Sequence, residues 1–173
     1  MSVQEHKDLS RQSVKVTVLT VSDTRTEQTD KSGRRMIEML HESGFGLADY
    51  EIVKDEPESI LKALYTAFER KDTDAVLING GTGISTRDIT VDTVQSLLEK
   101  ELPGYGELFR MLSYHEIGSA AMMSRAVAGT ARGKVIFVTP GSTGAVQLAM
   151  DRLILPELAH CVKELNKDKG AGS

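Results

Sequence analysis

The sequence is poor in the residues that build disulfides, metal clusters and aromatic stacks. Its 173 residues include a single cysteine, Cys161, four histidines and no tryptophan. A lone cysteine excludes an internal disulfide and any zinc or iron–sulfur site made of several cysteines, and the histidines form no metal-ligand pair at helical spacing. The sequence also lacks the ~20 successive apolar residues of a membrane helix and the apolar core of a signal peptide. We therefore expect a cytoplasmic protein.

A strong excess of charge of either sign is absent as well. There are 21 Lys and Arg residues against 25 Asp and Glu residues, which gives a formal net charge of -4. This balance argues against a broad surface for nucleic acid or anionic membrane, because both need a clustered positive field. With 40% hydrophobic and 27% charged residues, the composition is that of a globular domain. We expect one domain over residues 1–173, with its core at about 13–166 and flexible polar tails at Met1–Gln12 and Lys167–Ser173.

Short β-branched segments alternate with longer amphipathic segments through the middle of the chain. The first kind is typical of buried strands and the second of helices that cover a sheet. The alternation predicts an α/β fold of three layers, α/β/α, with an open and mostly parallel sheet. The predicted strands are Val14–Val21, Tyr50–Val53, Ala75–Ile78 and Lys134–Thr139. The predicted helices are Ser32–Ser43, Glu58–Arg70, Val91–Glu99, Glu107–Leu112, Ser119–Arg125 and Thr143–Leu165, the last with a kink at Pro156.

Small polar and glycine residues follow three of the predicted strands. Ser22, Asp23 and Thr24 follow the first, Asn79–Gly83 follows the third, and Pro140–Gly144 follows the last. Parallel sheets bind ligands beyond the carboxyl ends of their strands, and glycine lets backbone N–H groups approach a phosphate closely. The three loops together predict a site the size of a phosphate or nucleotide, although each loop alone is also typical of a tight turn between strand and helix. The residues predicted to line it are Ser22, Asp23, Gly80, Gly81, Thr82, Gly83, Gly141 and Ser142.

Two aspartates lie close to these loops. Asp55 follows the second predicted strand and Asp88 follows the glycine loop, so a parallel sheet brings both to the same edge. Mg²⁺ bound to substrate phosphates prefers one or two protein carboxylates, which makes Asp55 and Asp88 candidate metal ligands. The competing interpretations are local: Asp55 caps the helix that begins near Pro57, and Asp88 either caps a helix or pairs with Arg87.

Known nucleotide-binding patterns do not fit these loops. Gly81-Thr82-Gly83 lacks the third glycine of a dinucleotide fingerprint. Residues 129–135 imitate a phosphate-binding loop but end in Val135, where Ser or Thr would hold magnesium, and they precede a strand instead of following one. A flavodoxin-like carrier of flavin mononucleotide is a further alternative, because hydroxyl groups are frequent in Thr24–Ser32. The few aromatic residues argue against it.

Five segments, in order along the chain, resemble one family. They are GGTG at 80–83, RDIT at 87–90, PGYGE at 103–107, SRAVAG at 124–129 and PGST at 140–143. On these segments the chain is similar to the molybdopterin-binding family of molybdenum cofactor biosynthesis, which has an adenylyltransferase branch and a protein B branch. FRMLSYHEIGSA at 109–120 and PGSTGA at 140–145 resemble the protein B branch more.

The resemblance implies an activity as well as a fold. Active members transfer AMP from Mg-ATP to molybdopterin and release pyrophosphate, before molybdate is inserted. Their two catalytic aspartates correspond to Asp55 and Asp88, and their pterin and phosphate loops to Ser22 and Asp23, Gly80–Gly83, and Gly141 and Ser142. The resemblance further implies a homotrimer or homohexamer, with Mg²⁺ as the metal and no tightly bound organic cofactor. The alternative within the family is a member that binds molybdopterin or a partner enzyme of the pathway without catalysis.

Three arginines and the cysteine complete the set of candidate residues. Arg87, Arg110 and Arg125 have side chains that suit phosphate, but solvated faces and subunit interfaces are their more common positions. Cys161 lies at a core position of a predicted helix and is interpreted as a small packing residue, not as a nucleophile.

Overall fold

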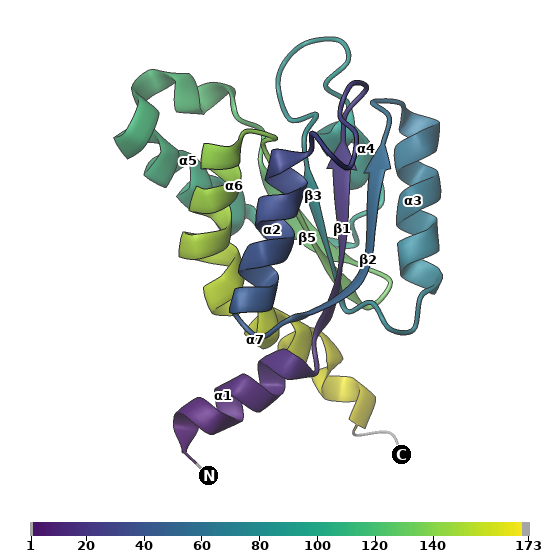
Figure 1. Cartoon of the computed structure of the whole chain (residues 1–173), viewed down its shortest axis with the longest axis vertical. Coiled ribbons are helices and arrows are strands. Elements are labelled where there is room, and N and C mark those ends of the chain that lie inside the picture. Colours follow the sequence, from purple (N-terminus) through teal and green to yellow (C-terminus); the bar gives the residue numbers. More distant parts are fainter. Residues whose placement is uncertain (1, 171–173) are drawn as a thin grey trace.

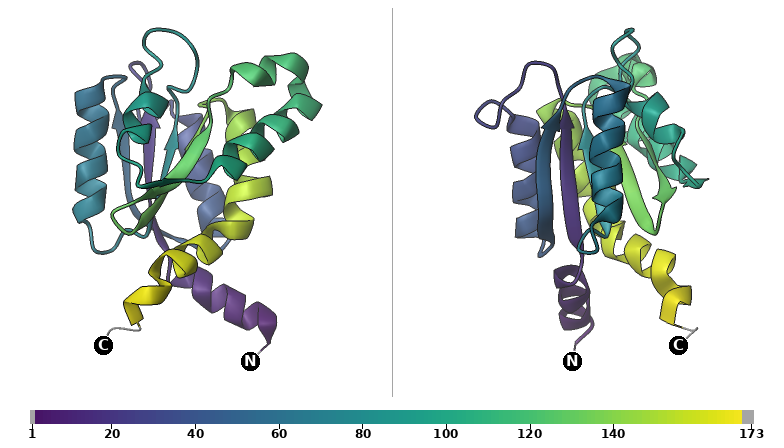
Figure 2. Two further views of the ribbon diagram at one scale, coloured as in Figure 1. Left: turned by 180° about the vertical axis from the view of Figure 1, so that it is seen from behind. Right: turned by 90° about the vertical axis from the view of Figure 1, so that its right-hand side faces the viewer.

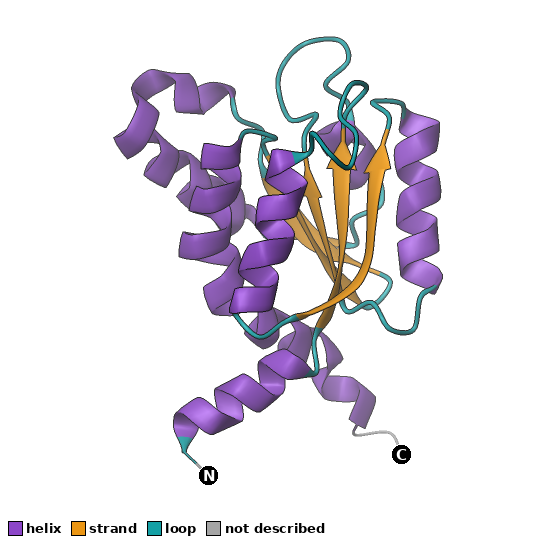
Figure 3. Cartoon of the chain, viewed as in Figure 1, coloured by secondary structure: helices purple, strands orange, loops and turns teal. Residues whose placement is uncertain are grey.

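The computed structural model describes residues 2–170, in which six strands form one sheet in the order β2-β1-β3-β6-β5-β4. The first four strands of that order run parallel, whereas β5 is antiparallel to both of its neighbours. Figure 3 shows the sheet between helices, with the loops that follow the parallel strands gathered at one end. The predicted fold class is therefore confirmed. The strands are β1 (Lys15–Val21), β2 (Gly46–Val53), β3 (Ala75–Asn79), β4 (Lys100–Glu101), β5 (Val127–Ala131) and β6 (Lys134–Thr139).

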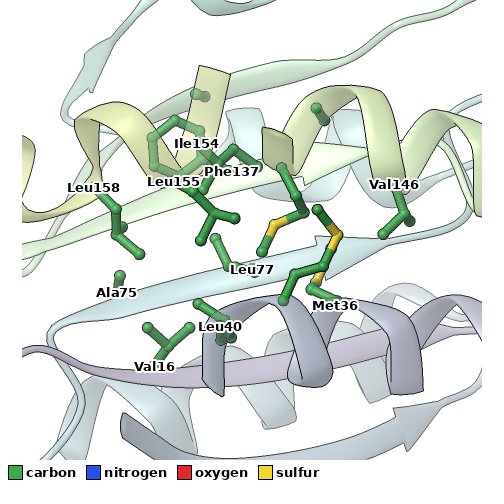
Figure 4. Close-up of a cluster of buried hydrophobic side chains, with 14 of the residues drawn as sticks. Val16, Met36, Leu40, Ala75, Leu77, Phe137, Val146, Ile154, Leu155 and Leu158 are labelled. Atoms are coloured by element: carbon green, nitrogen blue, oxygen red, sulfur yellow. The ribbon is translucent and has the colours of Figure 1, made fainter. Parts of the chain in front are cut away.

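Helices cover both faces of the sheet (Figures 1 and 2). Alternate side chains of β3 point to opposite faces of the sheet, and both faces are buried. Leu77 belongs to the hydrophobic cluster on one face, and Val76 belongs to the cluster on the other face. Figure 4 shows the first cluster, in which Leu77 lies between Leu40 and Ile154. The helices of that face are α2 (Lys31–Glu42), α5 (Pro103–Ile117), α6 (Thr143–Ala149) and α7 (Leu155–Asn166), and those of the other are α3 (Pro57–Glu69) and α4 (Thr90–Gln95).

The N-terminal segment is a helix, where the sequence predicted a flexible tail. Helix α1 (Val3–Gln12) begins with a capping box: the Glu5 backbone N–H donates to Ser2 Oγ over 3.1 Å, and the Glu5 carboxylate accepts from the Ser2 backbone N–H. These two bonds satisfy donors that a helix start otherwise leaves unpaired. Helix α1 projects from the end of the sheet opposite the loops (Figure 2).

The antiparallel strands β4 and β5 are also absent from the predicted elements. Strand β5 pairs with β6 through a tight hairpin whose turn residues, Arg132 and Gly133, have φ values of +51° and +75°. Two successive positive φ values are the mark of the turn that matches strand twist in short hairpins. Residues 129–135, rejected above as a phosphate loop, are this hairpin.

Helix boundaries differ from the prediction after β3 and near the C-terminus. The predicted helix Val91–Glu99 is shorter, because β4 follows it, and α5 begins earlier, at Pro103, which suits a first turn. The predicted helix Ser119–Arg125 is the 3-10 segment η1 (Gly118–Met123).

The long C-terminal helix has the predicted kink. A π-helical turn, η2 (Met150–Ile154), precedes Pro156 in the first turn of α7, since proline has no N–H to donate and crowds the preceding turn. Lys167–Gly170, predicted as tail, form the 3-10 segment η3, and residues 171–173 lie outside the described part of the chain. Within residues 2–170, no helix has the length and hydropathy required to span a bilayer.

Candidate functional site

A cavity of about 490 Å³ lies beyond the carboxyl ends of the parallel strands. In Figure 1 this is the end at which loops rise above the tips of β1, β2 and β3. The sequence prediction placed ligand binding at this edge, and all but one of the predicted residues line the cavity. The lining residues are Val21, Ser22, Asp23, Thr24, Arg25, Asp55, Gly80, Gly81, Thr82, Gly83, Asp88 and Gly141.

The exception is Ser142. Its side chain accepts a hydrogen bond of 3.1 Å from the Ala145 backbone N–H and so caps the start of α6. Gly141, the preceding residue, does line the cavity. Of the two residues predicted in this loop, Gly141 therefore lines the cavity and Ser142 caps the adjoining helix.

Glycine is required where the loop after β3 turns. Gly80 and Gly81 have φ values of +102° and +68°, a region that residues with a side chain rarely adopt. A Cβ atom on Gly80 would overlap the Val21 carbonyl oxygen, and one on Gly81 would overlap Thr90 Oγ1 and stand 3.2 Å from Asp55 Oδ1. The loop therefore presents bare backbone to the cavity beside the Asp55 carboxylate.

Asp55 is held at the cavity by its backbone. Its N–H donates to Asp23 Oδ1 over 3.0 Å, and its carbonyl accepts from Arg87 Nη2 over 3.2 Å. Helix α3 has Glu56 at its N-cap and no side-chain cap, so the alternative that Asp55 caps this helix is wrong. Burial raises the pKa of the Asp55 carboxyl, and the negative charges of Asp23 and Asp88 add to the shift. The ionised form of the Asp55 side chain is thus disfavoured in the ligand-free cavity.

Asp88 is held by the turn that contains it. Ser85 donates to Asp88 Oδ2 from its hydroxyl, over 2.7 Å, and from its backbone N–H, over 3.0 Å. The Ser85 hydroxyl is the main reason that the pKa of Asp88 is lowered. Arg87 pairs with Asp23, at 2.7 Å, and not with Asp88. Helix α4 has Ile89 at its N-cap and no side-chain cap, so both local alternatives for Asp88 are wrong. Asp88 is an ionised carboxylate at neutral pH.

The three arginines predicted as possible phosphate ligands each donate to backbone carbonyl groups. Arg125 donates to the Gly83 and Asp88 carbonyls, over 3.0 and 2.9 Å, and so ties η1 to the loop that carries Asp88. Arg110 donates to the Ser124 and Ala126 carbonyls. Arg87 bridges the loops after β1 and β2. None of the three lines the described cavity.

Arg25 is the lining residue that the sequence did not single out. It lies in the loop after β1 and donates to the Gly141 carbonyl, over 2.8 Å, and to Asn79 Oδ1, over 3.4 Å. A sequence gives little sign of such a residue, because its partners are 54 and 116 positions away. Cys161, by contrast, is half-buried on α7 as expected, and burial raises the pKa of its thiol.

Asp55 and Asp88 could hold a metal ion that completes its coordination with water and substrate phosphates. No group of three or more His, Cys, Asp or Glu residues able to hold a metal ion is found within residues 2–170. Asp55 and Asp88, both at the cavity, supply two carboxylates, and their like charges favour a cation between the loops. Mg²⁺ that retains waters and binds substrate phosphates needs no more from the protein.

Comparisons with known proteins agree with this architecture. Residues 17–160 match the family described as "Probable molybdopterin binding domain". The molybdenum cofactor biosynthesis protein B of Bacillus subtilis (strain 168) is 57% identical over 170 residues, which cover 98% of this chain and 100% of that protein. This chain belongs to the molybdenum cofactor biosynthesis protein B family. The resemblance predicted from five short segments is thereby confirmed, including its branch.

Solved structures of the protein B family share the fold closely. The crystal structure of one molybdenum cofactor biosynthesis protein B is 55% identical, with a TM-score of 0.87, and the match covers 89% of this chain and 96% of that chain. The tungsten cofactor synthesizing protein MoaB from Pyrococcus furiosus is 39% identical, with a TM-score of 0.80, covering 88% of this chain and 96% of that chain. A MogA structure has a TM-score of 0.79 at 26% identity and covers 87% of this chain and 99% of that chain.

Proposed function

We propose that this protein binds molybdopterin and transfers the adenylyl group of Mg-ATP to it. The observation that carries the proposal is the joint presence of the Asp55 and Asp88 carboxylates at one glycine-lined cavity. The B. subtilis relative bears the name of a molybdenum cofactor biosynthesis protein, and the family match points to molybdopterin as ligand. Adenylyl transfer as the reaction comes from the resemblance to active family members, and the two carboxylates and the phosphate-sized loops are compatible with it.

In this proposal Asp55 and Asp88 hold Mg²⁺ together with the phosphates of ATP. The ion, when bound, neutralises negative charge on the phosphates and orients them. Asp88 enters the reaction already ionised, because Ser85 stabilises its carboxylate. Asp55, whose ionised form is disfavoured by burial and by its neighbours, gains most from a cation. In the proposal both carboxylates therefore bind the same ion, although the ionised form is favoured at Asp88 and disfavoured at Asp55.

The backbone at Gly80–Gly83 supplies the space for the phosphates. An oxygen atom of the acceptor forms a bond to the α-phosphorus of ATP, the bond from that phosphorus to the bridging oxygen breaks, and pyrophosphate leaves with the electron pair. Such a displacement needs positioning and charge stabilisation more than a protein nucleophile. The bare glycine backbone, which no Cβ atom obstructs, suits that requirement.

The test is pyrophosphate release from Mg-ATP in the presence of molybdopterin. We expect release by the wild type and a fall in rate of about 10²-fold or more in Asp55→Asn and in Asp88→Asn, the size typical of losing one electrostatic contact to a transition state. Glu58→Gln, in the exposed first turn of α3, removes the same charge away from the cavity and should keep the wild-type rate.

Two results would contradict the proposal. One is a wild type that binds molybdopterin without releasing pyrophosphate, which favours the non-catalytic alternative. The other is full activity in both aspartate variants.

We also propose self-association, as a trimer or a hexamer. Large apolar side chains are exposed along α5 and η1, among them Tyr114 at 59%, Ile117 at 61% and Met122 at 80% exposure. Surfaces of this kind are commonly covered by another protein chain. We name residues 108–123 of this surface the α5–η1 face; its other exposed apolar members are Leu108, Met111 and Met123.

A further inference from the structure

The cavity has one basic side chain among its three acidic ones. Of the described residues that line it, Asp23, Asp55 and Asp88 are acidic and Arg25 is the only base. The Arg25 side chain is 30% exposed. Because Arg25 lines the cavity and its side chain is partly exposed, a ligand in the cavity could reach the guanidinium.

A buried carboxylate fixes the Arg25 guanidinium. Arg25 Nη1 lies 3.5 Å from Asp30 Oδ1, and the Asp30 side chain is 0% exposed. Asp30 also accepts from the Gly33 backbone N–H, over 3.0 Å, and from the Tyr50 hydroxyl. Because a buried charge requires such partners, Asp30 can pair with the guanidinium while it accepts these two hydrogen bonds.

Arg25 and two of the three acidic residues stand over different strands. Asp55 follows β2 and Asp23 follows β1, whereas Arg25 donates to Asn79 at the end of β3 and to Gly141 beyond β6. The sheet order is β2-β1-β3-β6, and neighbouring strands are about 4.8 Å apart. The Arg25 guanidinium therefore stands over the ends of β3 and β6, whereas two of the three acids, Asp55 and Asp23, follow β2 and β1. The third, Asp88, reaches the cavity from the loop after β3.

We propose that Arg25 binds a substrate phosphate group that the metal does not reach. The inference rests on the proposed function for the identity of the substrates, which are both phosphorylated. A guanidinium makes short, charge-assisted and often bidentate hydrogen bonds to phosphate oxygens. Arg25 has five N–H donors, of which three face Gly141, Asn79 and Asp30, which leaves two for a phosphate. Asp55 and Asp88 then hold the metal-bound phosphates, and Arg25 holds the phosphate over the ends of β3 and β6.

The first experiment measures binding of inorganic pyrophosphate by calorimetry with Mg²⁺ present. We expect Arg25→Gln to weaken binding by about 10-fold or more, and Arg25→Lys, which keeps the charge but loses the planar fork, to recover part of the affinity. Arg35→Gln is the matched control: Arg35 lies on α2, pairs with Glu38 and Glu42, and stands outside the cavity. Thermal melts of each variant check that the fold is kept.

The second experiment identifies which substrate supplies the phosphate. In steady-state pyrophosphate release, Arg25→Gln raises KM for ATP alone if the group belongs to the nucleotide, and KM for molybdopterin alone if it belongs to the acceptor. A structural role alone would lower kcat or thermal stability and leave pyrophosphate affinity unchanged.

The outcomes separate the two proposals. Three results would each overturn the role of Arg25, even if turnover is normal. They are wild-type pyrophosphate affinity in a folded Arg25→Gln protein, an equal loss of affinity in Arg35→Gln, and no pyrophosphate binding by the wild type. Weakened pyrophosphate binding in Arg25→Gln without any turnover by the wild type supports Arg25 and rejects the transferase.

Discussion

Three aspartates at one cavity differ in acidity because their hydrogen bonds differ. Arg87 donates to Asp23, and this bond lowers the pKa of Asp23. Ser85 does the same for Asp88. The Asp55 side chain has no comparable donor, and burial raises its pKa. The environment of each carboxylate, and not its residue type, thus decides whether its pKa is raised or lowered.

This difference predicts opposite effects of two similar substitutions on stability. The pKa of Asp55 is raised in the folded state, so its ionisation costs free energy at neutral pH; Asp55→Asn should stabilise the ligand-free protein at pH 7. Since Asp55 is partly exposed, we expect only about 0.5 kcal/mol, or roughly 1–2 °C in Tm. The gain should disappear as the pH falls below the ordinary value of 3.8, because Asp55 is then protonated in both states.

Asp88→Asn should lower the Tm instead. The pKa of Asp88 is depressed, so its charge contributes stability that is present above 3.8 and is lost as the pH falls through the folded-state value. Thermal melts from pH 7 downward, with and without Mg²⁺, measure both variants. A lower Tm for Asp55→Asn at pH 7 would contradict the assignment, and added Mg²⁺ should stabilise the wild type more than either variant.

Residue-level prediction succeeded where a strand end and its loop are adjacent in sequence. Asp55, Asp88 and the glycines follow predicted strands directly, so the parallel topology was sufficient to bring them to one cavity. Ser142 caps α6 and is not among the residues that line the cavity, because a serine before a helix has two uses, binding and capping, which its sequence position does not distinguish. The role of Arg25 was missed because it depends on Asp30, Asn79 and Gly141, which no local pattern connects to it.

Some helices and strands could be located from the sequence more accurately than others. Strands β1, β3 and β6 are buried on both faces and consist almost entirely of apolar and β-branched residues, so they were predicted nearly to the residue. Strand β4 consists of the exposed residues Lys100 and Glu101, and β5 contains Gly129 within a short segment of small residues. Of the two turn residues of the hairpin, Gly133 is typical of such turns, whereas Arg132 is an uncommon residue at a positive φ. The sequence of the turn therefore gave only a weak indication of a hairpin. Helix α1 was indicated only by the Ser2 and Glu5 pair, since its described side chains are nearly all exposed.

The contact between α2 and β2 offers a test at this scale. Asp30 caps α2 through the Gly33 N–H and accepts from the Tyr50 hydroxyl on β2. Tyr50→Phe leaves a buried carboxylate with one donor fewer, and we expect a loss of about 1–3 kcal/mol in the free energy of unfolding, measured by urea denaturation. Tyr65→Phe, at a half-exposed position of α3, removes a hydroxyl without a comparable partner and should change stability by less than about 0.5 kcal/mol.

At the scale of the whole molecule, the largest apolar exposure and the cavity are connected. The α5–η1 face ends at Met123, and Arg125, two residues later, holds the loop of Asp88. A subunit packed on this face would therefore also steady the cavity. A cluster of large exposed apolar side chains is typical of a surface that another protein chain covers, which is why we expect an oligomer.

Light scattering after gel filtration measures the assembly. We expect the wild type at three or six times its chain mass of 18.9 kDa. Ile117→Glu combined with Met122→Glu should give a monomer, since two charges would have to be buried in the contact. Val3→Glu, at an equally exposed position of α1, is the control and should leave the assembly intact. A monomeric wild type would exclude the α5–η1 face as a self-association surface.

The position of α1 has a practical consequence. This helix leaves the sheet at the amino ends of its strands, while the cavity opens at the carboxyl ends (Figure 1). An affinity tag, a fluorophore or a surface tether joined ahead of α1 is therefore separated from incoming ligands by the full height of the sheet. Immobilisation through that end leaves the mouth of the cavity facing the solution.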